Sequence, residues 1–170
     1  MAKPEFTDAI ALLKADHRKV EDLFDQFEKT KSAAKKQKIC HEFCTELKIH
    51  IMLEEEIFYP ALRGKIDDDM LDEAYVEHDG AKVLINDLAS SGPQSDFYDA
   101  KVTVLSEEIE HHVEEEEMPR DGMFAQARKV EVDLVAMRDQ MLARKQELMA
   151  LAQGPGLPIA KSHAVNLVTA

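Results

Sequence analysis

Four stretches of this sequence repeat apolar residues at helical spacing, and each stretch also places ionisable side chains within its apolar stripe. His17, for example, falls between Leu13 and Val20, four residues after one and three before the other. Burying a carboxylate or an imidazolium without a partner costs several kcal/mol, so such groups need a counterpart inside the fold. The pattern therefore indicates a helical fold whose interior holds a cation. The six residues are His17, His50, Glu54, His78, His112 and Glu116.

The apolar spacing predicts four helices joined by short links, which is typical of an antiparallel, up-down four-helix bundle in an all-α fold. Capping residues and helix breakers set the expected limits. Thr7 or Asp8 begins the first helix, and Pro119 and Gly122 close the fourth. The first helix should run to about Lys31, the second should end between Pro60 and Gly64, the third should extend from Asp67–Asp69 to Ser90, and the fourth should begin at Ser95 or Asp96.

A fifth helix is expected at about residues 133–151, where Leu134, Met137, Met141 and Leu148 form a further apolar stripe. It should flank or cap the bundle. We therefore expect one domain over residues 1–153, with a metal-binding core at about 6–119. The remaining residues, 154–170, are expected to form a loop or a loosely ordered tail.

The composition limits the partners of the chain. Its 170 residues carry a net charge of -13, which predicts repulsion from nucleic acid and from anionic membranes. The opening residues show no apolar signal-peptide segment, and no apolar run is long enough to span a membrane. Two cysteines cannot build a disulfide framework, so the cytoplasm is the expected compartment.

The six candidate ligands follow one pattern that occurs twice. His17 is followed 33 residues later by His50-x-x-x-Glu54, and His78 is followed 34 residues later by His112-x-x-x-Glu116. Residues four apart lie on one face of a helix, so each His-x-x-x-Glu pair can bind at one place. Two such halves predict a pair of metal ions inside the bundle. Imidazole and carboxylate ligands suit iron or manganese, and zinc remains compatible with them.

The fourth helix offers a second register, because His111-x-x-x-Glu115 has the same spacing as the pair one residue later. The residues on the His112 face are more apolar than those on the His111 face, so the sequence favours His112 and Glu116 as the buried pair. His111 with Glu115 remains the alternative pair, and Glu117 is the reserve carboxylate.

The segments DHRKVEDLF, HIMLEEEIFYP, EAYVEHDGAK and EEIEHHVEEEEMP resemble the hemerythrin-like HHE cation-binding domains. The similarity covers about residues 6 to 119. It implies a four-helix bundle around a non-haem di-iron centre with an oxo or hydroxo bridge, in which Glu54 and Glu116 bridge and the histidines bind terminally. Activities known in this family are dioxygen binding, oxygen or iron sensing, nitric oxide and peroxide chemistry, and repair of damaged iron–sulfur centres.

The chain departs from the oxygen-carrying members, which have a His-x-x-x-His pair on the third helix. Here the residues four away from His78 are Ala74 and Lys82, so one imidazole is missing. This absence favours a reactive or sensing centre over simple oxygen carriage. We expect decomposition of peroxide as the leading function, with O2 or NO binding and iron storage or delivery as alternatives. Tyr75 lies on the face of His78 and could approach the vacant position, although core packing is its favoured role.

The remaining candidate residues are expected to have structural or surface roles. Cys40 and Cys44 are interpreted as core residues, with a redox pair as the minor alternative, and His41 and His163 are placed on the surface and in an unstructured tail. Four glutamates are expected to form a solvated face that could also attract iron; they are Glu55, Glu56, Glu114 and Glu115.

Overall fold

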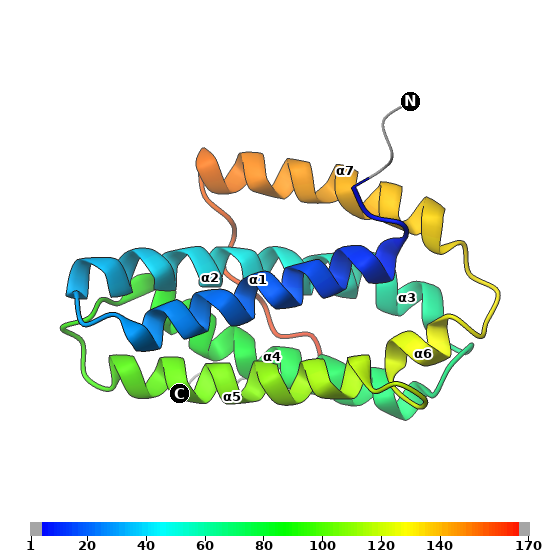
Figure 1. Cartoon of the computed structure of the whole chain (residues 1–170), viewed down its shortest axis with the longest axis horizontal. Helices are drawn as coiled ribbons and strands as arrows, with labels where there is room; N and C mark the ends of the chain where they lie inside the picture. Colours follow the sequence, from blue (N-terminus) through cyan, green and yellow to red (C-terminus); the bar gives the residue numbers. More distant parts are fainter. Residues whose placement is uncertain (1–4, 167–170) are drawn as a thin grey trace.

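The computed structural model describes residues 5–166, and all regular structure within this range is helical, as the sequence predicts. Four long helices lie side by side along the long axis of the molecule (Figure 1). They are α1 (Ala9–Lys29), α2 (Ala33–Leu53), α4 (Asp68–Ser90) and α5 (Tyr98–Glu117). Each contacts its neighbours in the order α1, α2, α4, α5 and back to α1, so the four enclose a common interior.

A further long helix, α7 (Leu134–Gln153), covers α1 and α2 from outside. The expected fifth helix is therefore present and flanks the other four. The short helix α6 (Met123–Ala127), which the sequence did not predict, closes the end of the molecule near α3 (Figure 1). None of the helices in the described range is long and apolar enough to cross a membrane.

Side chains fix most of the helix starts. The Asp8 carboxylate accepts a hydrogen bond from the backbone N–H of Ala11 at 2.9 Å, and Asp67 caps α4 in the same manner. The predicted start of α5 at Ser95 or Asp96 is wrong, because the helix begins after Phe97, whose backbone is left-handed with φ 62°. The Ser95 hydroxyl accepts a hydrogen bond from the Gly92 N–H within the preceding turn, and α5 has no side-chain cap.

The second predicted helix is interrupted where the sequence indicates a continuous one. After α2, residues Glu54–Phe58 form a turn of π-helix (η1), followed by the short helix α3 (Tyr59–Leu62). The backbone N–H of Tyr59 donates to the carbonyl of Glu54, five residues earlier. A π turn inserts one residue into the helical repeat, which changes the face that the following residues present. Tyr59 is thereby brought to the same interior as Glu54.

Two apolar clusters fill the interior, and the ionisable residues lie between them along each long helix. One cluster joins the start of α1 to η1, α3, α6 and α7, and includes Leu13, Phe58 and Phe124. The other fills the opposite end, with Val20 and Phe43 among its members. The polar layer is therefore enclosed by apolar packing from two sides, which keeps it away from solvent.

The C-terminal tail has no helix between α7 and residue 166, as expected, but it is attached to α4. The carboxylate of Asp79 accepts hydrogen bonds from the backbone N–H groups of His163, Ala164 and Val165 at 2.7 to 3.0 Å. The imidazole of His163 stacks on the ring of Tyr75, with the ring centroids 4.2 Å apart. The expectation that His163 is unstructured is therefore wrong, because a buried carboxylate anchors the backbone beside it.

Candidate metal centre

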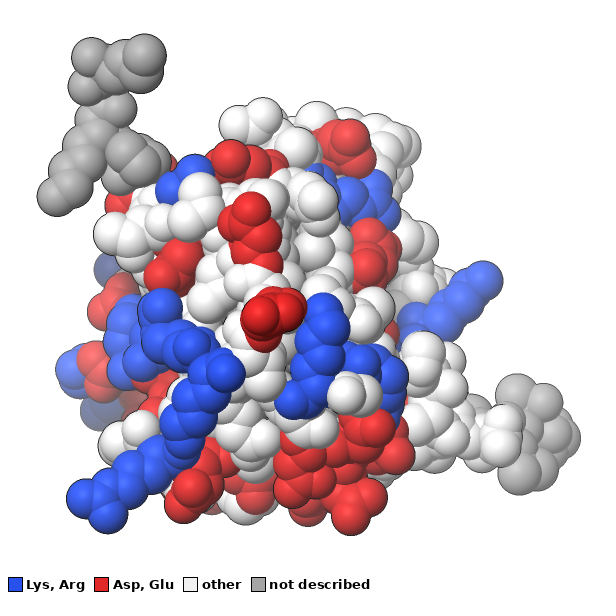
Figure 2. Space-filling view, turned by 90° about the vertical axis from the view of Figure 1, so that its right-hand side faces the viewer, with Lys and Arg blue, Asp and Glu red and all other residues white. Residues whose placement is uncertain are grey.

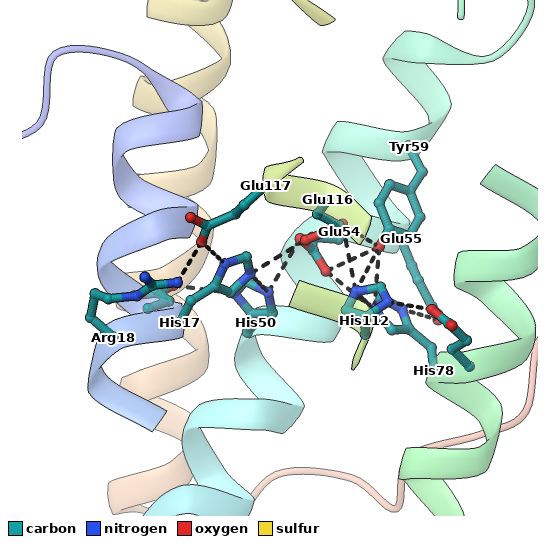
Figure 3. A network of polar contacts seen from close by, with 12 residues as sticks. His17, Arg18, His50, Glu54, Glu55, Tyr59, His78, His112, Glu116 and Glu117 are labelled. Atoms are coloured by element: carbon teal, nitrogen blue, oxygen red, sulfur yellow. Dashed lines mark hydrogen bonds and ion pairs between the residues drawn. The ribbon is translucent and has the colours of Figure 1, made fainter. Parts of the chain in front are cut away.

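The structure brings the six predicted ligands into one buried layer. They come from α1, α2, η1, α4 and α5, and each is between 0% and 5% exposed. His17 and His50 lie on one side of the layer, His78 and His112 lie on the other, and the two glutamates lie between them (Figure 3). The two sequence halves therefore correspond to two halves of a single centre.

Within each half, two imidazole rings point the same nitrogen at one another. The Nε2 atoms of His17 and His50 are 3.1 Å apart, and those of His78 and His112 are 3.2 Å apart. Two ligand atoms bound to the same ion lie about this far apart, since metal–nitrogen distances are about 2 Å. The geometry of each pair therefore fits a shared metal ion.

The two buried carboxylates each face both halves. Glu54 places Oε1 3.2 Å from Nε2 of His50 and Oε2 3.2 Å from Nε2 of His78. Glu116 places Oε2 3.4 Å from Nε2 of His17 and Oε1 3.5 Å from Nε2 of His112. Each glutamate thus offers one oxygen to each half, which is the arrangement that a bridging carboxylate requires.

A carboxylate also lies behind each imidazole, at its other nitrogen. Such a partner fixes the orientation of a metal-binding ring and makes its free nitrogen a better donor. The distances to Nδ1 are 2.7 Å for Glu117 and His17, 3.7 Å for Asp16 and His50, 3.1 Å for Glu55 and His78, and 2.7 Å for Glu77 and His112. Glu55 is therefore not part of a solvated face, and Glu117 lies behind His17 on the side away from the other buried ligands.

The charges of the layer fit a bound cation. Burial opposes a charge on His50, but the carboxylates of Glu54 and Asp16 outweigh it and raise the pKa of the imidazole to about 10. Burial opposes a charge on His78 in the same way, and Glu54 and Glu55 raise its pKa to about 9. Atom Oε1 of Glu54 and atom Oε2 of Glu116 are buried without a hydrogen bond from the described residues. A pair of metal ions would neutralise and bind both oxygens, so these donors fit such a pair.

Tyr59 belongs to the centre, although the sequence analysis did not select it. Its hydroxyl donates to Oε1 of Glu116 at 2.9 Å and lies 3.2 Å from Oε2 of Glu54. It also lies 3.3 Å from Nε2 of His78 and 3.5 Å from that of His112 (Figure 3). The apolar pattern around Tyr59 indicates only a core residue, and the π turn that aims it inward leaves no clear sequence signal.

The sequence profile of the family described as Hemerythrin HHE cation binding domain matches residues 8–119, which is more than half of the chain. The chain belongs to this family. Its membership, together with the buried clusters of His and Glu, makes it a metal-binding protein.

Two known proteins resemble this HHE domain. The crystal structure of a hemerythrin HHE cation-binding domain-containing protein from Mycobacterium kansasii superposes with a TM-score of 0.72 and 20% identity, covering 89% of this chain and 96% of the other, so the two share a fold. A protein named as a DNA nickase from Nostoc sp. is 26% identical over 106 residues. The match covers 62% of this chain but only 30% of that relative, so most of the relative has no counterpart in it.

The structure also places the alternative ligands of the HHE domain. His111 and Glu115 lie on the surface, where Nε2 of His111 is 3.4 Å from Oε1 of Glu115 and 3.5 Å from Oε1 of Glu77. His112 and Glu116 point into the bundle from the same helix. The register favoured by the sequence is therefore the one that faces the interior.

The other candidates lie away from the buried ligands. Tyr75 packs in the core, 5.2 Å from the ring of Tyr59, and its hydroxyl makes no hydrogen bond to the six ligands. Cys40 and Cys44 are buried in the second apolar cluster, which agrees with a core role. Three further residues are exposed as predicted; they are His41, Glu56 and Glu114.

Proposed function

We propose that the chain is a non-haem di-iron protein of the antiparallel four-helix bundle type and that it decomposes peroxide. The ligands would be His17, His50, Glu54, His78, His112 and Glu116, with Tyr59 as a further donor beside the second histidine pair. Four imidazoles and two carboxylates suit iron, and the buried tyrosine oxygen would add a hard donor, favouring iron over zinc, if it binds as a phenolate. The cytoplasm is the proposed compartment.

The observation that carries this proposal is a small enclosed cavity against the histidines. Its volume is about 10 Å³, which is close to the least space that holds one water molecule. The cavity as it stands admits a molecule about the size of water, and peroxide or a diatomic gas would enter with small shifts of the lining side chains. The lining consists of the four histidines with Asp16, Val20, Leu47, Ile51, Ile109 and Val113.

When bound, a pair of iron ions would supply two-electron chemistry by alternating between diferrous and diferric forms. The apolar residues around the cavity exclude bulk water from the site. Three of the four carboxylates behind the rings, Glu117, Glu55 and Glu77, hold their imidazoles in place through Nδ1. Asp16 lies 3.7 Å from Nδ1 of His50 and makes no hydrogen bond to it.

Tyr59 holds a proton inside this dry layer. Burial and the negative charges of Glu116 and Glu54 raise the pKa of its phenol well above the ordinary value, so the hydroxyl keeps its proton until a cation arrives. The phenol can then either bind as a phenolate or donate its proton at Oε1 of Glu116. In the second role it would place an acid within the layer where a small oxidant would react.

The test is oxygen release from peroxide by the iron-loaded protein. We expect one molecule of O2 and two of water from every two of peroxide, and no release from the metal-free protein. Reversible binding of O2 or NO without turnover would overturn the peroxide proposal and favour a sensing module, which the same cavity also fits. Storage of iron as a mineral is disfavoured, because this cavity has no room for one.

The proposed partners are small oxidants and do not include DNA. The net charge of -13 opposes binding to a phosphate backbone. Figure 2 shows Lys and Arg side chains interleaved with Asp and Glu on the end face, so the basic groups there do not stand alone. We therefore do not extend the activity named for the Nostoc relative to this chain.

A further inference from the structure

The four carboxylates behind the imidazoles differ in how their own charge is balanced. Glu117 pairs with Arg18 at 2.7 Å, Glu55 pairs with Lys82 at 2.7 Å, and Asp16 pairs with Lys145. Glu77 is the exception, because no lysine or arginine of residues 5–166 forms an ion pair with it. It is also the only one of the four that faces an exposed histidine, His111.

Glu77 extends between the surface and the buried centre. Its Oε2 lies 2.7 Å from Nδ1 of His112, and its Oε1 lies 3.5 Å from Nε2 of His111. His111 is 62% exposed and also lies 3.4 Å from Oε1 of Glu115. The three donor atoms on the surface are within 4.8 Å of one another, which is compatible with binding one cation.

The surrounding charge favours a cation at this place. Glu73 and Glu108 add negative charge near Glu115 and Glu77, and neither forms an ion pair with a lysine or arginine of the described chain. On its exposed side this group of carboxylates thus faces the imidazole of His111, while the buried side of Glu77 faces His112. His111 and Glu115 also repeat, one residue earlier, the His-x-x-x-Glu spacing of the buried pair.

We propose that Glu77, His111 and Glu115 form an outer site for one divalent transition-metal ion, from which the buried centre is loaded. The donors are one imidazole nitrogen and two carboxylate oxygens, a set that Fe²⁺, Mn²⁺ and Zn²⁺ all accept. Water completes the coordination at the exposed side. Because Glu77 contacts both His111 and His112, it connects the outer site to a buried ligand. The loading role rests on the proposed function, whereas the outer site does not.

The first experiment counts the ions. Iron-loaded, full-length protein is titrated with Zn²⁺ by calorimetry, and we expect one site beyond the metal already bound. His111→Ala should abolish this additional Zn²⁺ site. His111→Lys should abolish it too, because the protonated lysine ammonium carries a positive charge and offers no free metal-binding nitrogen. His41→Ala, at another exposed histidine, should retain it. Equal Zn²⁺ binding by wild type and both His111 variants would overturn the outer site.

The second experiment tests loading. Metal-free protein is mixed with Fe²⁺ under anaerobic conditions, and the rate of uptake is compared with the final iron content. His111→Ala should slow uptake several-fold and leave the final content unchanged, because the buried ligands are intact. An unchanged rate would overturn the loading role. A chain that binds Zn²⁺ at the outer site but takes up no iron would instead contradict the proposed di-iron function, so the two failures are distinguishable.

Discussion

The two halves of the centre share one sequence pattern but have different surroundings. The half with His17 and His50 has four protein donors when Glu54 and Glu116 are included. The half with His78 and His112 gathers Glu54 in the same way and has the Tyr59 hydroxyl beside it, whereas Glu116 reaches this half only through Oε1, 3.5 Å from Nε2 of His112.

This difference bears on where a small oxidant could bind. The missing fifth histidine is not replaced by Tyr75, which stays in the core, but an oxygen donor from Tyr59 enters the same half of the centre. In the proposed centre the two halves would therefore differ in one donor, the Tyr59 hydroxyl, which lies beside His78 and His112 only. A repeated ligand pattern in the sequence has produced two chemically unequal positions.

The largest effect is expected from a residue that serves both halves. Glu54→Gln replaces a charged bridge with a neutral amide, and we expect the iron content to fall from two ions per chain to nearly none, as measured by metal analysis. Glu56→Gln is the matched control, because this neighbouring glutamate is exposed and pairs with Arg144. Retention of both ions in Glu54→Gln would contradict a bridging role.

Removing one histidine from each half tests whether the halves are unequal. His17→Ala and His78→Ala each take one imidazole away, and loss of a ligand lowers metal affinity steeply. We expect the His17 variant to lose more iron, because Tyr59 remains as an additional donor beside His78. Dialysis against a chelator followed by metal analysis gives the comparison. Equal losses would mean that Tyr59 does not contribute to binding.

Tyr59→Phe tests the donor that distinguishes the second half. We expect both irons to remain after mild dialysis, and the visible absorption of a phenolate bound to ferric iron to disappear. Tyr75→Phe is the control, because this ring lies in the same cluster without a hydroxyl contact to the ligands. A wild-type spectrum that already lacks the band would show that Tyr59 acts as a hydrogen-bond donor rather than a ligand.

The smallest effect is expected at the tail, which is attached to α4 at Asp79, the residue after His78. Asp79→Asn removes the charge that accepts three backbone hydrogen bonds from residues 163–165, and it weakens the contact with Lys82. We expect a loss of about 1–2 kcal/mol in the free energy of unfolding, with faster proteolysis of the tail and an unchanged iron content. Chemical denaturation measures the loss, and Asp87→Asn on the exposed face of α4 is the control.

Much of the architecture follows from local pattern. Apolar residues at helical spacing and capping groups such as Asp8 and Asp67 are short-range signals, so the number, order and approximate limits of the long helices were predictable. The inward register of His112 was predictable for the same reason, because the apolar residues on its face had to be buried. The start of α5 was not, since this helix has no side-chain cap and the Ser95 hydroxyl accepts a hydrogen bond within the preceding turn.

The sequence by itself determined the six histidines and glutamates of the buried layer, because ionisable groups at core positions within one helix are visible from spacing alone. Only the tertiary structure decided what surrounds them. The π turn brings Tyr59 to the ligands, Glu55 lies behind His78 instead of in solvent, and Asp79 holds the tail. These contacts join residues from different helices or depend on one inserted residue, and neither leaves a periodic signal in the chain. The two halves are alike in sequence and unequal in structure for that reason.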